Sequence, residues 1–323
     1  MANLKDYTIP LTLIHILSDG KFHSGELLGA KLGMSRAAIN KHVKTICGWG
    51  IDVISIQRKG YRLGQPMQLL NEDKICRELG QRKITVLSVI NSTNQFLLDR
   101  LPELESGDVC IAEYQHDGRG RRGRKWFSPF GSNLYLSMFW ALEEGAPALI
   151  GLSLVIGIVI AETLEKLGID GIRVKWPNDL YLYERKLAGI LIEISSKSGE
   201  AAKTVIGVGL NLSMQNAPKD EVDQAWISLD EAGIKIDRNV LCAHIIKDLR
   251  SSIPLFEKKG LEPFLSRWEE RDNFINRPVK LIIGDKEICG IYRGINERGA
   301  LLLEQDGVIT QWLGGEVSLR NID

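Results

Sequence analysis

Residues 118–140 read GRGRRGRKWFSPFGSNLYLSMFW, and this stretch separates two possible fold classes for the chain. Its first eight residues interleave three glycines with five cations, and no acidic residue lies between Gly118 and Lys125. Glycine lets backbone N–H groups approach a ligand closely, while arginine binds phosphate or carboxylate through a planar fork of donors. The segment is therefore predicted to be a loop that closes over a small anion.

The same run matches the glycine pattern G-x-G-x-x-G of dinucleotide-binding folds, but its context argues against that assignment. Such a site needs a strand before the glycines and a helix that opens directly after them. Residues 108–115 predict the strand, but residues 126–133 are rich in loop-forming types and residues 134–140 predict a second strand. A solvated basic loop or a nucleic-acid-binding patch is the simpler alternative for this segment.

The composition is that of an ordinary globular protein with more than one domain. The chain has 323 residues, of which 44% are hydrophobic and 25% charged, and its formal net charge is zero. The length predicts two or three domains. A zero net charge argues against wholesale nucleic-acid binding, although acidic regions elsewhere can balance one basic segment.

Several features predict a cytoplasmic location. The five cysteines are far apart and form no C-x-x-C pair, which is typical of free thiols in a reducing compartment. The apolar run 11–17 lacks the cationic leader and the cleavage site of a signal peptide. The apolar stretch 146–161 is too short to span a bilayer and belongs to a predicted buried helix over 147–167.

Residues 1–65 are predicted to form a winged helix-turn-helix domain. A first helix covers residues 11–17, and Ser24 and Ser35 are placed to cap the second and third helices. In the third helix Ile39, Val43 and Ile46 recur at helical spacing and should face inward. Two apolar segments, 51–56 and 61–63, flank a basic tip and predict a β-hairpin.

The outward face of the third helix and the hairpin tip carry residue types that contact DNA. Asparagine and arginine can hydrogen-bond base edges, and lysine neutralises phosphate. The predicted DNA-binding residues are Ser35, Arg36, Ala37, Asn40, Lys41, Lys44, Arg58 and Lys59. A helical dimerisation or adaptor domain with a solvated basic face is the alternative.

The rest of the chain divides into two predicted domains. Residues 66–273 mix strands and helices at unequal spacing, which favours an α/β domain with a mixed sheet. Residues 274–323 consist of short strands separated by turn-forming residues and predict a small SH3-like β-barrel. The predicted fold class is thus multi-domain α/β, with the cationic loop in the central domain.

The central domain lacks the signatures of several enzyme classes. It has no Walker loop, no G-x-S-x-G nucleophile elbow and no histidine pair at zinc-binding spacing. His116 beside the loop is placed to act as a base, but a solvated loop histidine is the simpler interpretation. Residues 92–94 open a predicted helix, where exposed hydroxyl and amide groups either bind a neutral polar ligand or only cap the helix.

Five segments together resemble the biotin protein ligases. They are STN at 92–94, GRGRRGRKW at 118–126, KWPNDL at 175–180, KLAGIL at 186–191 and GVGLN at 207–211. With the winged helix upstream, the chain is similar over its whole length to the bifunctional bacterial type, which is both biotin–[acetyl-CoA-carboxylase] ligase and biotin operon repressor. The combination of GRGRRGRKW with KWPND is highly specific, and either half alone is less so.

The resemblance implies a two-step reaction without an enzyme nucleophile. The biotin carboxylate attacks the α-phosphate of ATP to give biotinyl-5′-AMP, and a lysine of the biotin carboxyl carrier protein then attacks this mixed anhydride. Such catalysis consists mostly of positioning and of charge neutralisation between two anions, which suits a cationic loop.

The resemblance also implies roles for individual residues. The implied biotin-binding positions are Ser92, Thr93, Asn94, Gln115, Arg119, Gly120, Arg121 and Lys186. The implied nucleotide-binding positions are Arg121, Arg122, Trp126 and Asn178, with Trp126 either packed on the adenine or held as a core residue beneath the loop. The implied catalytic residues are Lys186, Arg121 and Asp179. Mg²⁺ accompanies ATP, and Asp179 is implied either to hold it with Asn178 or to help the transfer step.

The same family implies a form of regulation. Biotinyl-5′-AMP serves there as corepressor, because it promotes a homodimer that binds operator DNA. The strand over 189–195 is a candidate dimer edge, and an ordinary internal strand is the alternative. Two other hypotheses stay open: a transcription factor that senses biotin or a nucleotide without catalysis, and a ligase whose N-terminal domain no longer binds DNA.

Overall fold

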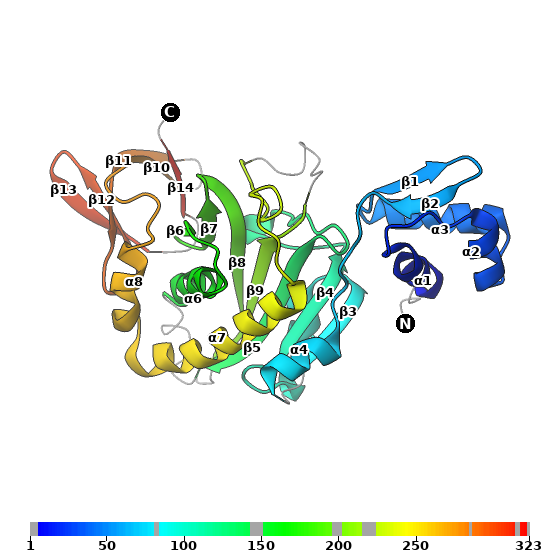
Figure 1. The fold of residues 1–323 in the computed structure, drawn as a ribbon. Helices are drawn as coiled ribbons and strands as arrows, with labels where there is room; N and C mark the ends of the chain where they lie inside the picture. Colours follow the sequence, from blue (N-terminus) through cyan, green and yellow to red (C-terminus); the bar gives the residue numbers. More distant parts are fainter. Residues whose placement is uncertain are drawn as a thin grey trace.

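Three structural units follow one another along the chain, and Figure 1 shows them arranged in a row. The computed structural model describes residues 6–80, 84–142, 151–195, 202–214, 224–283, 286–313 and 317–321. A helical unit with a small hairpin lies at one end, a large sheet with its helices lies in the middle, and a second sheet lies at the other end. The predicted multi-domain fold is confirmed.

The N-terminal unit is a winged helix-turn-helix, as predicted. The Ser24 side chain accepts a hydrogen bond from the Leu27 amide and the Ser35 side chain accepts one from the Ala38 amide, so both serines cap their helices. Gly33 between these helices has φ = +64°, the left-handed conformation that glycine adopts most easily. The elements are α1 (Thr8–Leu17), α2 (Gly25–Leu32), α3 (Arg36–Gly48), β1 (Val53–Ile56) and β2 (Gly60–Leu63).

The central unit is built on a seven-stranded mixed sheet in the order β3-β4-β5-β9-β8-β7-β6. Strands β3 and β4 are parallel, and every other neighbouring pair is antiparallel. The strands are β3 (Ile84–Ile90), β4 (Val109–Gln115), β5 (Asn133–Leu142), β6 (Arg173–Lys175), β7 (Asp179–Leu182), β8 (Arg185–Ser195) and β9 (Ala202–Asn211). The helices are α4 (Glu72–Leu79), α5 (Thr93–Leu98), α6 (Leu152–Lys166), α7 (Arg238–Lys259) and α8 (Leu265–Glu269).

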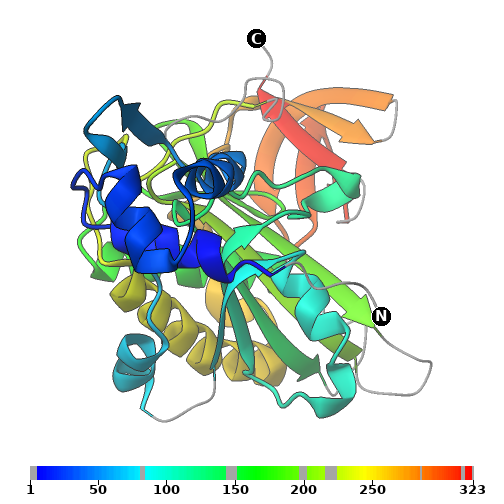
Figure 2. The ribbon, with the colours of Figure 1, turned by 90° about the vertical axis from the view of Figure 1, so that its right-hand side faces the viewer.

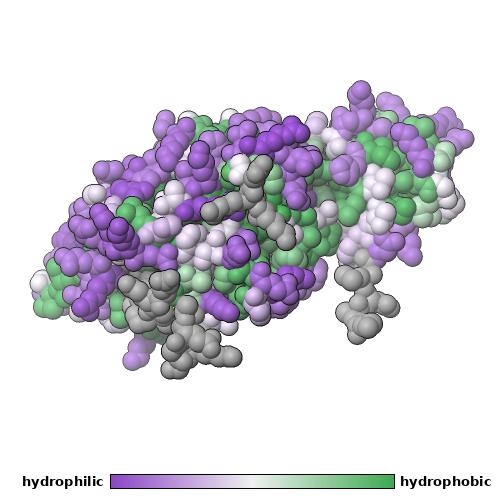
Figure 3. Space-filling view, turned by 90° about the horizontal axis from the view of Figure 1, so that it is seen from below, coloured by the Kyte–Doolittle hydropathy of each residue, from purple (hydrophilic) through white to green (hydrophobic). Residues whose placement is uncertain are grey.

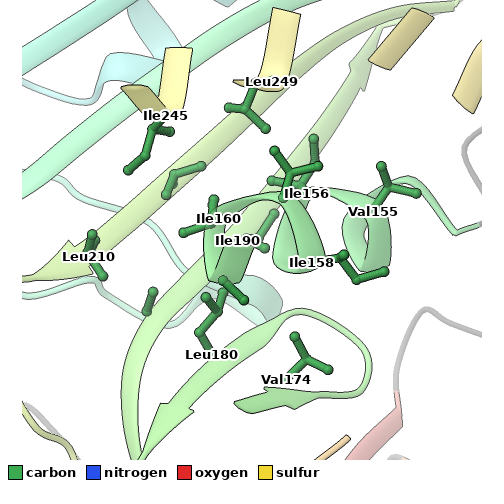
Figure 4. Packing of buried hydrophobic residues seen from close by; sticks show 14 of the residues in the cluster. Val155, Ile156, Ile158, Ile160, Val174, Leu180, Ile190, Leu210, Ile245 and Leu249 are labelled. Atoms are coloured by element: carbon green, nitrogen blue, oxygen red, sulfur yellow. The ribbon is translucent and has the colours of Figure 1, made fainter. Parts of the chain in front are cut away.

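Helix α6 is the hydrophobic centre of this unit. Val155, Ile156, Ile158 and Ile160 point to different sides of the helix, and all are buried. Figure 4 shows them between the sheet residue Ile190 and residues of α7. A helix that is apolar on every side needs protein on every side, and the sheet and α7 provide it. Within the described ranges, no helix is both long and apolar enough to cross a membrane.

The C-terminal unit is a five-stranded antiparallel sheet in the order β13-β12-β11-β10-β14. Its strands are β10 (Pro278–Ile283), β11 (Lys286–Ile295), β12 (Leu301–Gln305), β13 (Val308–Trp312) and β14 (Val317–Asn321). Figure 2, which looks from the side of the N-terminal unit, shows the C-terminal strands at the upper edge of the central unit.

Some elements were not predicted from the sequence. Helices α4 and α8 and the short strand β7 were missed, and the predicted helix over 147–167 is observed from Leu152 onward. Residues 147–150 of that prediction lie outside the described residues. The domain boundaries at 65/66 and 273/274 stay predictions.

Candidate active site

One cavity of about 370 Å³ brings together residues that are far apart in the sequence. Its walls come from the start of α5, the cationic loop, the turn before β7, strands β8 and β9, and the segment around Trp226. Every residue predicted to bind biotin or nucleotide lines it, as does the predicted catalytic residue Asp179: the binding residues are Ser92, Thr93, Asn94, Gln115, Arg119, Gly120, Arg121, Arg122, Trp126, Asn178 and Lys186. Their individual roles stay predictions.

The segment Ser92–Asn94 both caps a helix and lines the cavity. Ser92 is the N-cap of α5, and its side chain accepts a hydrogen bond from the Gln95 amide at 3.5 Å. The Thr93 amide and hydroxyl both donate to Oε1 of Gln115, at 2.9 and 3.1 Å. The sequence suggested exposed groups here, but all three residues are only 3–4% exposed, because β4 and β5 pack against the start of α5.

The cationic loop is a closed hairpin. Arg119 and Lys125 form an antiparallel bridge, and the Gly120 amide donates to the Arg124 carbonyl at 2.7 Å. At the base, the Trp126 amide donates to the Gly118 carbonyl at 2.8 Å. A Cβ on Gly118 would lie 2.5 Å from the Trp126 carbonyl oxygen, so this position requires glycine. These hydrogen bonds give the loop a defined shape, in which the cations Arg119 and Arg121 flank Gly120.

Arg119 and Arg121 contact different partners. The Arg119 guanidinium donates to Glu193 and to the Gln95 side chain, at 2.8–3.0 Å. Nη1 of Arg121 donates to Oδ1 of Asn178 at 3.0 Å. Burial lowers the pKa of Arg121, and the nearby Asp179 carboxylate acts in the opposite direction. A partly buried cation that faces the cavity is well suited to bind an anion there.

Lys186 and Asp179 form an ion pair at the same wall. Nζ of Lys186 lies 2.9 Å from Oδ1 of Asp179, and each side chain is 13% exposed. The two residues are on neighbouring strands, where a register shift between Leu180 and Tyr181 separates the regular pairs. The lysine Nζ also lies 5.5 Å from the centroid of the Trp126 ring. The carboxylate thus fixes the position of a cation that points toward the loop.

Two paired glycines form the floor beneath Trp126. Gly189 on β8 is paired with Gly209 on β9. A Cβ on Gly209 would lie 2.4 Å from the indole, and one on Gly189 would lie 3.0 Å from it. The indole can approach the sheet this closely only because both side chains are absent. Nε1 of Trp126 is buried and makes no hydrogen bond within the described part of the chain.

The predicted DNA-binding residues lie away from this cavity, in the N-terminal unit. All eight are exposed: six belong to α3 or its cap, and two to the tip between β1 and β2. Figure 1 shows α3 and the β1–β2 hairpin at the end of the molecule opposite the C-terminal sheet. His116, the candidate base, is about half exposed, pairs with Asp117 and does not line the cavity.

Lys175 and Trp226 also line the cavity, and sequence reasoning assigned neither of them a role. Lys175 is 4% exposed, and its Nζ lies 2.9 Å from the Tyr181 hydroxyl and 5.4 Å from the Phe274 ring centroid. Lys175 belongs to the KWPND motif, and this motif was the sequence signal that could have identified it as a cavity residue. Trp226 is joined to Lys186 by a parallel bridge, and no local pattern predicts that contact.

The residues present fit a metal ion carried by a nucleotide better than a metal site made by protein alone. Among the described residues, no group of three or more histidine, cysteine or acidic side chains is placed to hold a metal ion. Asp179 is the only carboxylate among the described residues that line the cavity. One carboxylate together with phosphate oxygens and waters is a usual environment for Mg²⁺.

Comparisons with known proteins agree with this geometry. Residues 86–211 match the biotin/lipoate A/B protein ligase family, residues 11–62 match an HTH domain, and residues 274–320 match the biotin protein ligase C-terminal domain. The chain is 64% identical to the bifunctional ligase/repressor BirA of Escherichia coli and 63% identical to that of Salmonella typhimurium. Each match covers 99% of this chain and 100% of the relative.

A solved structure extends the agreement to three dimensions. Biotin protein ligase from Aquifex aeolicus in complex with biotin and ATP superimposes with a TM-score of 0.67 at 29% identity. The match covers 75% of this chain and 100% of that chain. The chain therefore belongs to the biotin protein ligase family, in the bifunctional form that joins a ligase domain to a DNA-binding repressor domain.

Proposed function

We propose that the cavity forms biotinyl-5′-AMP from biotin and ATP, and that the chain then transfers biotin to a lysine of the biotin carboxyl carrier protein of acetyl-CoA carboxylase. The single observation that supports this most is the convergence of Arg121, Lys186 and Trp126 on one cavity. Relatives that bear the name biotin–[acetyl-CoA-carboxylase] ligase, and the Aquifex aeolicus complex with biotin and ATP, agree with this chemistry.

In the first step two anions must meet. The biotin carboxylate attacks the α-phosphate of ATP and pyrophosphate leaves, so negative charge builds on the phosphate oxygens. Arg121 and Lys186 provide positive charge next to the adjacent residues Asn178 and Asp179, and Asp179 orients Lys186. The buried start of α5 and Gln115 would hold the neutral ring end of biotin through hydroxyl and amide groups. Asp179 and Asn178 are the residues that would hold Mg²⁺, which would neutralise charge on the ATP phosphates.

In the second step the carrier lysine attacks the acyl carbonyl, and AMP leaves. This step needs no enzyme nucleophile, since the anhydride is already activated. The residues of the site keep the adenylate in place and exclude water until the carrier arrives.

We further propose that biotinyl-5′-AMP acts as corepressor by promoting a homodimer that binds operator DNA. One edge of β8 supports a dimer contact. Strand β7 pairs with β8 only as far as Gly189, so residues 191–195 pair only with β9 among the described residues. Ile194 on this stretch is 49% exposed. An unpaired strand edge is a ready template for pairing with a second copy.

The adenylation assay tests the ligase proposal directly. Purified protein with ATP, Mg²⁺ and biotin should release pyrophosphate, and addition of a biotin carrier domain should give biotinylated carrier. Omission of biotin is the control. Absence of both adenylate and product would rule the ligase out and leave a sensor without catalysis.

Lys186→Ala separates the two activities. We expect adenylation to fall by about 10²–10³-fold, because a preorganised charge at the reacting phosphate is lost. DNA binding measured with preformed biotinyl-5′-AMP should change much less. An equal loss of both activities would show that Lys186 is structural.

A further inference from the structure

Glu193 on β8 contacts the cationic loop without lining the cavity. Its Oε1 and Oε2 accept hydrogen bonds from Nη2 of Arg119 at 3.0 and 2.9 Å. The two side chains are 27% and 34% exposed, so the contact is only partly screened by water. A loop arginine is thereby attached to the central sheet.

The same carboxylate also contacts α5. Nδ2 of Asn94 donates to Oε2 of Glu193 at 2.8 Å, and Nη1 of Arg119 donates to Oε1 of Gln95 at 2.8 Å. Asn94 is 4% exposed, and its own position is fixed by the Ser137 hydroxyl and by Gly207. One carboxylate therefore joins three segments: the loop, the start of α5 and strand β8.

The contact has two physical consequences for the loop. It pairs Arg119 with a carboxylate outside the cavity, whereas Arg121 donates to Asn178 at the cavity wall. It also restrains the hairpin, because Arg119 is bridged to Lys125 and the neighbouring Gly120 amide is bonded to Arg124. Fixing the Arg119 side chain consequently limits where Arg121 and Trp126 can lie.

We propose that Glu193 is a positioning residue of the ligase: it holds Arg119 against β8 and α5 and so sets the cationic loop over the bound biotinyl adenylate. This inference rests on the ligase function proposed above. Glu193 acts on the loop through Arg119. A surface ion pair without this role contributes little to any property of the protein, and the test is designed to distinguish the two.

The chain offers a closely matched control. Glu184 accepts two hydrogen bonds from Arg277, at 2.7 and 3.0 Å, and one from the side-chain amide of Asn273 at 3.3 Å. This is the same set of partner types that Glu193 has, but neither Glu184 nor Arg277 lines the cavity. Glu184→Gln thus removes a charge pair with the same partner types that does not line the cavity.

The experiment compares full-length wild type with Glu193→Gln, Arg119→Gln, the double variant and Glu184→Gln. The first measurement is KM for biotin and kcat of biotin-dependent pyrophosphate release. The second is the rate of trypsin cleavage between Arg121 and Trp126 without ligand, taken relative to cleavage elsewhere in the chain. The ratio corrects for any general loosening of the fold.

For Glu193→Gln we expect KM for biotin to rise about tenfold, with a smaller change in kcat, and loop cleavage to accelerate by a similar factor, as loss of a charged hydrogen bond implies. Glu184→Gln should resemble wild type in both measurements. Adding Glu193→Gln to Arg119→Gln should not accelerate loop cleavage further, because the two residues restrain the loop as one unit.

Two results would overturn the inference. One is a wild-type rate of loop cleavage in Glu193→Gln. The other is an effect of Glu193→Gln on loop cleavage that persists in the Arg119→Gln background. A wild-type protein that releases no pyrophosphate would instead contradict the proposed ligase function, and the proteolysis measurement would still decide whether Glu193 positions the loop.

Discussion

The two flanking domains are attached to the catalytic domain in different ways. The C-terminal sheet shares its core with it, since Val279, Leu281 and Tyr292 belong to the same buried cluster as α6 and α7. The N-terminal domain has a separate core, which meets the catalytic domain through a small apolar patch at Phe130, with Tyr114 packed beside it. Figure 3 shows the N-terminal domain projecting at one end of the molecule.

Polar contacts show the same difference. On the C-terminal side, Nε1 of Trp176 donates to the Gly299 carbonyl at 3.0 Å, and the Tyr292 hydroxyl donates to Asp272 at 2.7 Å, both buried. On the N-terminal side, the Phe130 amide donates to the Trp49 carbonyl at 2.9 Å. The C-terminal domain is therefore part of the ligase body, whereas the DNA-binding domain has its own core and meets the catalytic domain at the contact of Trp49 with Phe130.

The largest effect on stability is expected in the core that the C-terminal and catalytic domains share. Tyr292→Ala should lower the free energy of unfolding by about 3–5 kcal/mol, because a fully buried ring and its hydrogen bond are lost. Catalytic and C-terminal domains should unfold together in chemical denaturation. Burial raises the pKa of the Cys242 thiol to about 12, so this thiol should react with alkylating reagents only in that same transition.

Tyr292→Phe is the control for this variant, since it keeps the ring and removes only the hydroxyl bond to Asp272. It should cost less than Tyr292→Ala. Loss of the C-terminal sheet in an earlier, separate transition, with Cys242 still protected, would show that the two cores are independent.

The next effect concerns the linker that leads from the N-terminal domain. Glu113 and Arg238 form an ion pair at 2.9 Å, with side chains only 5% and 6% exposed. Glu113 also accepts from the Leu70 amide, and Arg238 donates to the Gln68 carbonyl at 2.7 Å. Glu113→Gln should destabilise the protein by about 3 kcal/mol, because it leaves the buried Arg238 charge without its partner.

Glu231→Gln is the matched control, because Glu231 forms an exposed ion pair with Arg185. Glu231→Gln should change the free energy of unfolding, measured in urea, by no more than about 0.5 kcal/mol. If both variants lost the same unfolding free energy, burial of the Glu113–Arg238 pair would add nothing to its contribution to stability.

The difference between local and long-range patterns explains what the sequence could predict. Helices α2 and α3 were predicted with their caps because Ser24 and Ser35 act within three residues of their targets. The cavity residues were grouped through motif resemblance, and their convergence on one cavity is observed. Helix α4 was missed because its pattern is mostly charged and only Ile75 is buried.

Contacts between segments that are distant in the chain could not be predicted from the sequence. Arg119 is 74 residues from Glu193 in sequence, and nothing near either residue indicates the ion pair. Trp49 and Phe130 meet only because the linker sets the domain against the sheet. The exposed placement expected for Ser92–Asn94 was wrong for the same reason, since β4 and β5 cover those residues.

A smaller effect is expected at the point of contact between the N-terminal and catalytic domains. The Trp49 ring is stacked on Phe130 at 5.6 Å and also lies 5.8 Å from Tyr114. Trp49→Leu keeps an apolar side chain but loses these ring contacts, which should cost about 1–2 kcal/mol. In calorimetry the transition of the N-terminal domain should shift to lower temperature while the main transition stays in place. A shift of the main transition instead would contradict the separate cores.

The smallest effect on the fold, and the most specific effect on function, is expected for Lys41→Ala. Lys41 is exposed on α3, and the structure describes no contact between Lys41 and the catalytic domain. If Lys41 neutralises a DNA phosphate, Lys41→Ala should weaken binding to a fragment carrying the regulatory region of the biotin operon, by a similar factor for every sequence variant of that DNA. The slope of log affinity against log salt concentration should become shallower by about 1. Biotin ligation by the same preparation should be unchanged, since the two domains have separate cores. A parallel fall in ligation would mean that the DNA-binding face and the ligase cavity are coupled more tightly than the separate cores indicate.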